Sequence, residues 1–444
     1  MQIGMYLQDK TKDESEMQEK FFQMLQAAKR SNLDLLVLPE GAYTPYDQEL
    51  EKIALQVSGE DRFARKQLEN IMGKIIKQSG CPLILSRSDK NGRVYSCYLN
   101  PRARKQETRS HYYWKQIATE KSLLDSAKFS ELVERVFSPI KLRGFLIGQT
   151  IFDDAVFPLF SRLYGRKKVD ILINSSSGQV DYKKWSYYHK VRAIENKCTV
   201  LSTMAYSNPR KKQKAYVFAY DANGAALDYN IVNSAGEKSL CCYDGLYVFR
   251  PEKSAAFAQK PSGIDEFINQ EENLNKNFDL IFNPREILKN RAKLKKAADN
   301  LYYFQKNDKT VVVAVIGQHD ILKPEYTASL LYHKNLQKLP DKRYIVINEW
   351  REIEPQFYEA ILSNVLKVRA AENFCTVMLV SPNLVKCFQV SNNKNIQVVK
   401  MQKNSFQLDL RRMTGPEALW KTKANPLMKK EWRVNYEKLL DCFS

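Results

Sequence analysis

An eleven-residue segment occurs twice in this chain of 444 residues, and the repeat limits the fold more than any other feature of the sequence. Residues 190–200 read KVRAIENKCTV and residues 367–377 read KVRAAENFCTV, so nine of the eleven positions are identical. Internal repeats indicate that one supersecondary unit has been used more than once. We therefore predict a duplication within the chain.

Two shorter matches precede these segments in the same order. Residues 146–149 (LIGQ) return as 315–318 (VIGQ), and residues 171–174 (ILIN) return as 345–348 (IVIN). The three offsets are 169, 174 and 177 residues, which keeps the order and allows for small insertions. The pattern predicts a partial second copy in the C-terminal half of the chain.

The spacing of apolar residues predicts alternating helices and strands over the first 250 residues. Residues 14–30 and 62–78 carry apolar side chains at helical spacing. The run 33–38 is mostly apolar and ends at Pro39, as expected for a central strand of a parallel sheet. Such alternation is typical of an α/β fold.

Residues 144–158 have the pattern of a buried strand, a sharp turn and a helix. The strand is predicted at 145–151, and the helix begins near Pro158. In α/β hydrolytic folds a turn of this kind, called the elbow below, presents a nucleophile above the sheet edge. The residue at the elbow is Phe152, which cannot attack a carbonyl or nitrile carbon.

Other residues near the elbow are poor substitutes for a nucleophile. Thr150 is two residues back on the same strand face, and therefore lies ~6.6 Å lower. Asp153 and Asp154 follow the elbow, and Cys198 belongs to a later predicted strand.

The chain is strongly basic, with 70 Lys and Arg against 50 Asp and Glu, a net charge of +20 and a pI near 9.4. Clustered cations attract phosphate polyanions by releasing counterions, so the charge favours a nucleic-acid partner. An acidic protein partner and a merely solvated surface remain open. The candidate nucleic-acid contacts are Arg102, Arg104, Lys105, Lys211, Lys212, Lys289, Arg291, Lys293, Lys295 and Lys296.

The cysteine and histidine pattern predicts neither disulfides nor a metal site. The eight cysteines have no CxxC spacing, and the four histidines are scattered singly. We expect no cofactor. The chain has no secretory signal pattern and no apolar run near the ~18–20 residues of a membrane helix, so we expect a cytoplasmic protein.

Seven short motifs in the first 250 residues resemble, in order, the nitrilase (carbon–nitrogen hydrolase) superfamily. They are residues 1–8 (MQIGMYLQ), 35–41 (LLVLPEG), 113–115 (YWK), 151–154 (IFDD), 157–158 (FP), 170–174 (DILIN) and 192–196 (RAIEN). The resemblance implies a four-layer αββα sandwich, followed by a partial repeat of the same fold.

The resemblance also implies a reaction, in which a cysteine thiolate attacks an amide or nitrile carbon. A glutamate takes the thiol proton because an ordinary thiol pKa is about 8.5, and a lysine stabilises the developing anion. These roles fall on Glu40 and Lys115, with a second glutamate at Glu120, while Phe152 stands in the place of the cysteine. We expect Phe152 to cap a pocket in which Glu40 and Lys115 lie within salt-bridge reach.

The sequence predicts three regions: a nitrilase-like domain over 1–250, a linker with a basic amphipathic helix over 251–308, and a partial repeat over 309–444. The helix is expected at 284–301, from apolar residues at three- and four-residue spacing. The elbow of the second copy is expected near Ile321.

We expect a catalytically inactive nitrilase-like scaffold or binding protein that acts with nucleic acid or a nucleic-acid enzyme. Nitrilase-like domains attached to bacterial antiviral reverse transcriptases suggest a role in defence. Because family members pair through the surface beside the elbow helix, we expect a homo- or hetero-oligomer. The alternative is a hydrolase of C–N bonds, of the amidase or nitrilase type, with a non-standard nucleophile.

Overall fold

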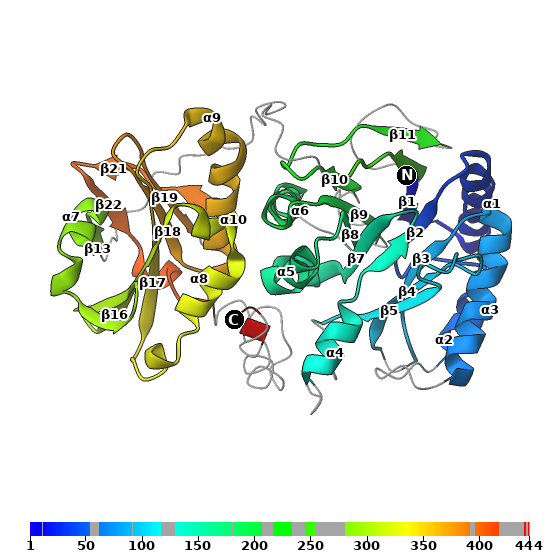
Figure 1. The fold of residues 1–444 in the computed structure, drawn as a ribbon, viewed down its shortest axis with the longest axis horizontal. Helices are drawn as coiled ribbons and strands as arrows, with labels where there is room; N and C mark the ends of the chain where they lie inside the picture. Colours follow the sequence, from blue (N-terminus) through cyan, green and yellow to red (C-terminus); the bar gives the residue numbers. More distant parts are fainter. Residues whose placement is uncertain are drawn as a thin grey trace. The chain divides into compact units, whose positions relative to one another are not determined.

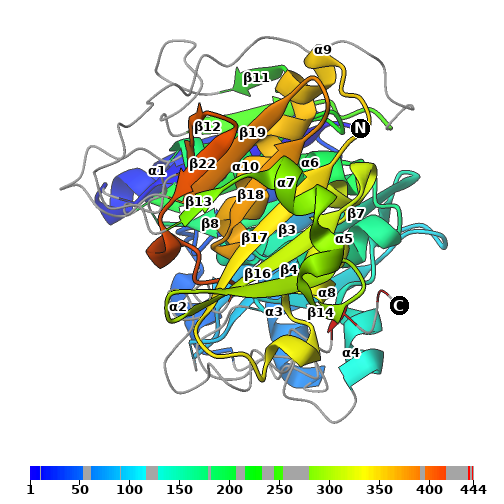
Figure 2. The same ribbon diagram turned by 90° about the vertical axis from the view of Figure 1, so that its left-hand side faces the viewer.

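The computed structural model describes residues 1–10, 12–53, 62–90, 92–116, 129–178, 182–206, 216–232, 245–253, 280–390, 396–416, 439–440 and 443. The chain divides into two compact units, Met1–Lys260 and Pro261–Ser444. Each unit is an α/β structure built around its own sheets (Figures 1 and 2).

The strands of the first unit follow the order β5-β4-β3-β2-β1-β9-β8-β7-β6, and β1 and β9 touch only at their ends. The parallel strands β1, β2 and β3 form one half of this path, and the parallel strands β9, β8 and β7 form the other. The bounds are β1 (Ile3–Asp9), β2 (Leu35–Glu40), β3 (Leu83–Ser88), β4 (Val94–Leu99), β5 (Ser110–Trp114), β6 (Ile140–Leu142), β7 (Phe145–Ile151), β8 (Ile171–Ser177), β9 (Thr199–Tyr206), β10 (Phe218–Tyr220), β11 (Tyr229–Val232) and β12 (Gly245–Phe249).

Helices cover both outer faces of the first unit, so its layers run helix, sheet, sheet, helix (Figure 1). On one side lie α1 and α3, and on the other lie α5 and α6. The bounds are α1 (Glu14–Arg30), α2 (Asp47–Glu51), α3 (Arg62–Ser79), α4 (Phe129–Val136), α5 (Pro158–Arg166) and α6 (Tyr182–Asn196). The αββα sandwich predicted for this part of the chain is confirmed.

Local chemistry explains where these elements begin and what they bury. Asp13 caps α1 by accepting a hydrogen bond from the Glu16 amide at 2.8 Å. All six residues of β2 are buried, as predicted for a central strand. The helix α5 starts at Pro158, because a proline at the first helical position lacks only an amide that would have no helical partner.

The second unit is built on a sheet with the order β14-β15-β16-β17-β18-β19-β20, in which β16, β17 and β18 are parallel (Figure 2). The strands are β14 (Lys295–Ala298), β15 (Leu301–Lys306), β16 (Lys309–Ile316), β17 (Lys342–Glu349), β18 (Thr376–Val380), β19 (Val385–Val390) and β20 (Ile396–Val398). Its helices are α7 (Pro284–Lys289), α8 (Pro324–Leu331), α9 (Pro355–Phe357) and α10 (Ser363–Asn373).

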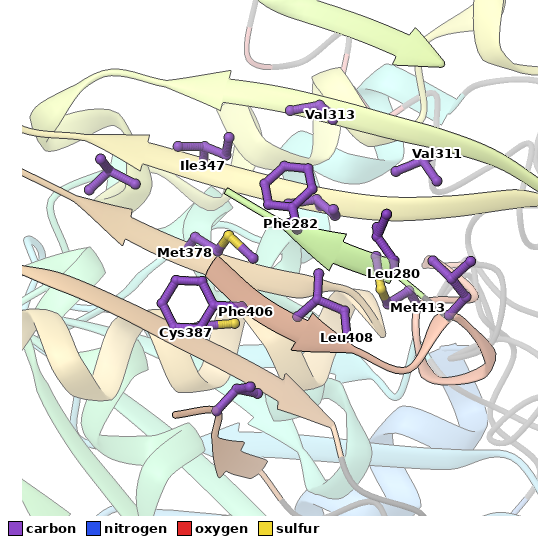
Figure 3. Packing of buried hydrophobic residues seen from close by; sticks show 14 of the residues in the cluster. Leu280, Phe282, Val311, Val313, Ile347, Met378, Cys387, Phe406, Leu408 and Met413 are labelled. Carbon is purple, nitrogen blue, oxygen red and sulfur yellow. The ribbon is translucent and has the colours of Figure 1, made fainter. Parts of the chain in front are cut away.

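A small sheet packs on one face of this larger one and closes the core. It has the order β13-β22-β21, formed by β13 (Leu280–Phe282), β22 (Ser405–Leu408) and β21 (Met401–Gln402). Phe282 and Phe406 belong to the same buried cluster as Val313 of β16, Ile347 of β17 and Met378 of β18 (Figure 3).

The basic helix predicted at 284–301 is wrong beyond Lys289. Asn290 ends α7, a short turn follows at 291–293, and β14 and β15 then form a hairpin that turns at Asn300. The β-branched and aromatic residues that flank the segment favour strand pairing, which overrides the accidental helical spacing of a few leucines and lysines. Residues 280–306 thus supply core strands to the second unit, where a linker was predicted.

The elbow of the second unit lies at Gln318, and its predicted place at Ile321 is wrong. Short 3-10 turns begin at Phe152 and at Gln318, and the helices after them begin six residues later, at Pro158 and Pro324. The side-chain amides of two asparagines, one on β8 and one on β17, donate to the carbonyls of Phe152 (3.4 Å) and Gln318 (3.3 Å).

The short motif match of 146–149 with 315–318 is therefore displaced. Gln149 lies inside β7, whereas Gln318 follows β16 and is the counterpart of Phe152. The matches 171–174 with 345–348 and 190–200 with 367–377 do fall on like elements: a strand, a helix end and the next strand. The duplication itself stays a prediction.

The same buried ion pair holds both elbows. Arg192 on α6 donates from Nε to a carbonyl of the first elbow at 2.9 Å and pairs with Glu195 at 2.7 Å. Arg369 on α10 donates from Nε to the Ile321 carbonyl at 3.1 Å and pairs with Glu372 at 2.6 Å. All four side chains are buried, so each guanidinium links a helix end to the turn packed against it.

Replacing Arg369 by methionine should lower the free energy of unfolding by about 3–5 kcal/mol, because the Glu372 carboxylate stays buried without its guanidinium. Urea unfolding, with hydrogen exchange of β16–β18 to assign the loss to the second unit, measures the effect. The double variant Arg369→Met with Glu372→Leu should lose less, since both charges are removed. A double variant that is less stable than the single one would contradict this account.

Candidate functional site

Three segments of the first unit end or turn at one edge of its sheets. Glu40 is the last residue of β2, Lys115 follows the last residue of β5, and Phe152 follows the last residue of β7. Ser177 is the last residue of the neighbouring strand β8. Carboxyl ends of parallel strands are where α/β folds gather functional side chains.

The structure brings Glu40, Lys115 and Phe152 together. Lys115 Nζ lies 3.6 Å from Glu40 Oε1, and the two side chains are only 12% and 9% exposed. The same ammonium lies 4.9 Å from the centroid of the Phe152 ring, within cation–π reach. On α6, Trp185 stacks on Phe152 with centroids 5.2 Å apart and planes 12° from parallel.

The Glu40 carboxyl is buried at the centre of this group. Burial raises its pKa, while the Lys115 ammonium and a hydrogen bond with Ser177 act in the opposite direction. Asp153, on the elbow, raises the pKa further by repulsion. Glu40 Oε2 is buried with no hydrogen-bond partner among the described residues. The described residues therefore satisfy only part of the hydrogen-bonding capacity of this carboxyl.

Phe152 adopts the strained backbone of an elbow, with a φ of +40°. A bulky residue in this region costs on the order of 1–3 kcal/mol, so neighbouring groups must hold it there. The buried Asp154 carboxylate does so by accepting hydrogen bonds from the Tyr113 hydroxyl (2.8 Å) and the Gln116 amide (3.0 Å). Arg192 also binds two carbonyls of the turn, those of Ala155 and Val156.

Two described cysteines of the first unit, Cys81 and Cys198, lie away from this edge. Cys198 precedes β9 and Cys81 precedes β3, so both are at the amino ends of parallel strands, opposite Phe152 and Glu40. Burial raises the pKa of Cys81 to about 11 and that of Cys198 well above its usual range. The Thr150 hydroxyl is also engaged, because it accepts from Asn174 at 3.0 Å.

The other predicted site residues are not part of this group. Arg102, Arg104 and Lys105 are exposed on the loop between β4 and β5. The predicted cations of the second unit are also exposed, and two of them form surface ion pairs: Arg291 with Glu349 and Lys296 with Asp299. Glu120, Lys211 and Lys212 lie outside the described residues.

Sequence reasoning missed Trp185 and Ser177 as neighbours of the elbow. Trp185 stands in an aromatic cluster that reads as core, and only the stacking on Phe152 brings it to the site. Ser177 lies three residues beyond the 170–174 motif, because β8 runs on to Ser177 past the matched residues. Within the described ranges, no three His, Cys, Asp or Glu side chains gather to hold a metal ion.

A carbon-nitrogen hydrolase family model matches residues 1–238, which is more than half of the chain. Together with the sandwich fold, this defines the class: the chain belongs to the carbon-nitrogen hydrolase family. The family resemblance predicted from the sequence is thus confirmed. A search of curated proteins finds no match. No helix in the described part of the chain is long and apolar enough to cross a membrane.

Several solved structures are similar to this chain. A carbon-nitrogen hydrolase from Helicobacter pylori G27 is 16% identical with a TM-score of 0.39, and the match covers 57% of this chain and 90% of that one. An amidase, NitN, from Nesterenkonia sp. AN1 is 16% identical with a TM-score of 0.37, covering 56% and 92%. A mutant of the Nesterenkonia amidase in complex with butyramide is 16% identical with a TM-score of 0.39, covering 56% and 91%.

A buried histidine supports the aromatic side of the site. The His189 ring lies between Trp185 (5.3 Å) and Phe218 (5.2 Å). Burial lowers the pKa of His189 to about 3, and the Arg192 guanidinium lowers it further. The folded protein thus holds a neutral imidazole, whereas the unfolded chain takes up a proton below its ordinary pKa of 6.5. Stability from this residue is complete above that pH and is lost as the pH falls toward 3.

Replacing His189 by phenylalanine should remove this acid sensitivity, because the ring packing stays and the titrating nitrogen is lost. From about pH 8 to about pH 5, the parent protein should lose about 2 kcal/mol of unfolding free energy that the variant keeps. Urea unfolding at the two pH values measures this loss. A constant difference between the two proteins across this range would show that His189 is not held neutral.

Proposed function

We propose that this chain is a non-hydrolytic member of the carbon-nitrogen hydrolase family that acts as a scaffold or binding protein. The observation that carries the proposal is Phe152 at the elbow, stacked on Trp185 with the Lys115 ammonium 4.9 Å from its ring. The phenyl ring occupies the place from which a nucleophile would attack. Loss of a nucleophile costs several orders of magnitude in rate.

The remaining charges suit a binding or structural role. Glu40 and Lys115 form a buried ion pair, and the desolvation cost of such a pair offsets much of its attraction, so it contributes little net stability. A carboxyl with a free oxygen beside an ammonium can instead accept a donor from a ligand. Neither role needs a covalent step.

The alternative function, C–N bond hydrolysis with a non-standard nucleophile, is favoured by one observation. The Glu40 carboxyl has a raised pKa, which suits a general base near neutral pH. This alternative requires that a hydroxyl, a carboxylate or a thiol from outside the described residues reach the Glu40–Lys115 pair.

The purified protein should show no turnover of short amides or nitriles above the uncatalysed rate. The variant Phe152→Cys should also be inactive, because truncation leaves a cavity beside Trp185 and does not place a thiol against a substrate. Ammonia release measures both. Turnover by the unaltered protein that disappears in Glu40→Gln and Lys115→Ala would establish the alternative.

The proposed partner is nucleic acid or a nucleic-acid-processing enzyme, which the net charge of +20 supports. A role in bacterial antiviral defence with a reverse transcriptase is the specific form of this proposal, and it rests on family association. Assembly of homo- or hetero-oligomers through the nitrilase-like face near α5 belongs to the same proposal. Five exposed cations from the end of α7 to the start of β14 are the candidate contact: Lys289, Arg291, Lys293, Lys295 and Lys296.

Replacing these five cations by glutamine should weaken binding to a polynucleotide and flatten the slope of log affinity against log salt, because fewer counterions are released. Gel shifts with single- and double-stranded DNA and RNA at two salt concentrations measure both effects. A matched control replaces five dispersed exposed lysines of the same unit, with the same change in charge: Lys323, Lys334, Lys338, Lys400 and Lys403.

The control separates a local contact from net charge. Equal weakening in the two variants would mean that overall charge, and not the 289–296 segment, drives binding. Affinity no tighter than about 10⁻⁴ M at physiological salt, together with a protein that co-purifies, would assign the basic surface to a protein partner.

A further inference from the structure

A cavity of about 340 Å³ lies at the edge of the first unit that is opposite to the candidate site. It is lined by Leu33 and Asp34, which precede β2, and by Cys81 and Pro82, which precede β3. Glu40 ends β2, six residues further on, so about 20 Å of strand separates the two places. The cavity is thus distinct from the Glu40–Lys115 pair.

Four cationic side chains line this cavity: Lys77 of α3, Arg102 and Arg104 of the β4–β5 loop, and Arg143 before β7. Among the described residues, no hydrogen bond or ion pair holds the side chains of Lys77, Arg102 and Arg104. The three charges are therefore available to a ligand.

Two carboxylates also line the cavity, but both are already engaged by the protein. Asp34 accepts from the Gln2 amide at 2.8 Å and pairs with Arg143 at 3.0 Å. Glu107 accepts from the backbone amides of Arg104 (3.1 Å) and Arg143 (3.2 Å). The first of these hydrogen bonds is the main reason why the pKa of Glu107 lies below its ordinary value. The carboxylates order the arginine loop, and the net character of the cavity is cationic.

The shape of the cavity depends on a glycine inside a helix. Gly73 lies in the middle of α3, where glycine costs roughly 1 kcal/mol relative to alanine. A Cβ atom at this position would meet nothing within 4 Å, so packing does not require the glycine. Its effect is to leave open the wall beside Ile76, which is one of several apolar groups in the lining.

We propose that this cavity binds a nucleoside 5′-phosphate, either free or at the 5′ end of a nucleic-acid strand. Arginine presents paired N–H donors that match phosphate oxygens, which places the phosphate against Arg102 and Arg104. The volume is within the range of small-molecule sites and exceeds what a lone phosphate needs, which leaves room for the sugar and base along α3 beside Gly73.

This inference goes beyond the proposed function. It needs neither loss of hydrolysis nor binding of a polynucleotide along the surface. Arg102 and Arg104 were predicted from the sequence as members of a basic cluster that contacts phosphates, and the cavity gives these two residues a definite ligand size.

Calorimetric titration of the full chain with adenosine 5′-monophosphate tests the proposal, with adenosine and inorganic phosphate as comparison ligands. The nucleotide should bind about tenfold or more tightly than either comparison ligand, since only it uses both parts of the cavity. The double variant Arg102→Gln, Arg104→Gln should weaken the nucleotide about tenfold or more. The backbone hydrogen bonds of these two residues survive the change, so the loop keeps its fold.

Two further variants separate the filling of the cavity from a general loss of positive charge. Gly73→Leu should weaken the nucleotide by filling the apolar wall, while it leaves all charges in place and adds a good helix former. The control Arg109→Gln, Lys141→Gln removes two exposed cations that do not line the cavity, one before β5 and one on β6, and it should bind like the parent protein.

The source of the nucleotide is distinguished by two oligonucleotides of one sequence, with a 5′-phosphate or a 5′-hydroxyl. If the ligand is a strand end, the phosphorylated oligonucleotide should bind more tightly and compete with the mononucleotide. If the ligand is a free nucleotide, the two oligonucleotides should bind equally. No nucleotide binding, equal affinity for inorganic phosphate, or equal weakening in the control variant overturns the proposal. The 289–296 variant should bind the nucleotide normally, so failure of the polynucleotide proposal is a separate outcome.

Discussion

The buried guanidinium of Arg192 is the interaction on which the geometry of the first unit's elbow depends. It reaches from α6 to the carbonyls of Ala155 and Val156, and its charge is balanced inside the protein by Glu195. Buried charges persist only where such pairing and hydrogen bonding are complete. The turn after β7 is therefore fixed by a helix that is distant in sequence, and α5 can begin at Pro158 in a definite direction.

Because the Arg192 guanidinium binds backbone carbonyl groups, this contact does not depend on which side chain stands at the elbow. Phe152 keeps a φ of +40° although its side chain gains nothing chemical from that strain. At the corresponding turn of the second unit Arg369 makes the same kind of contact, yet Gln318 is not among the residues with positive φ. The arginine contact is thus compatible with both a strained and a relaxed elbow.

The predictions from sequence succeeded where several local signals agreed. The buried run of β2 ending at Glu40 and the proline that starts α5 each combine hydrophobic pattern with a terminal signal. They failed where one signal stood alone. Helical spacing at 284–301 competed with strand pairing to β15, and a four-residue motif match placed the second elbow at Ile321. Stacking of Trp185 on Phe152 depends on tertiary packing and has no local signature.

Charged side chains are buried at one end of the strands of the first unit and exposed at the other. At the carboxyl edge, Glu40 and Lys115 are buried against aromatic rings, where desolvation raises the pKa of the carboxyl and few water molecules can screen the pair. At the amino edge, Arg102 and Arg104 remain exposed around a cavity, where a charged ligand replaces water at little desolvation cost. The amino edge of the first unit therefore suits the binding of an anion, whatever the chemistry at the carboxyl edge.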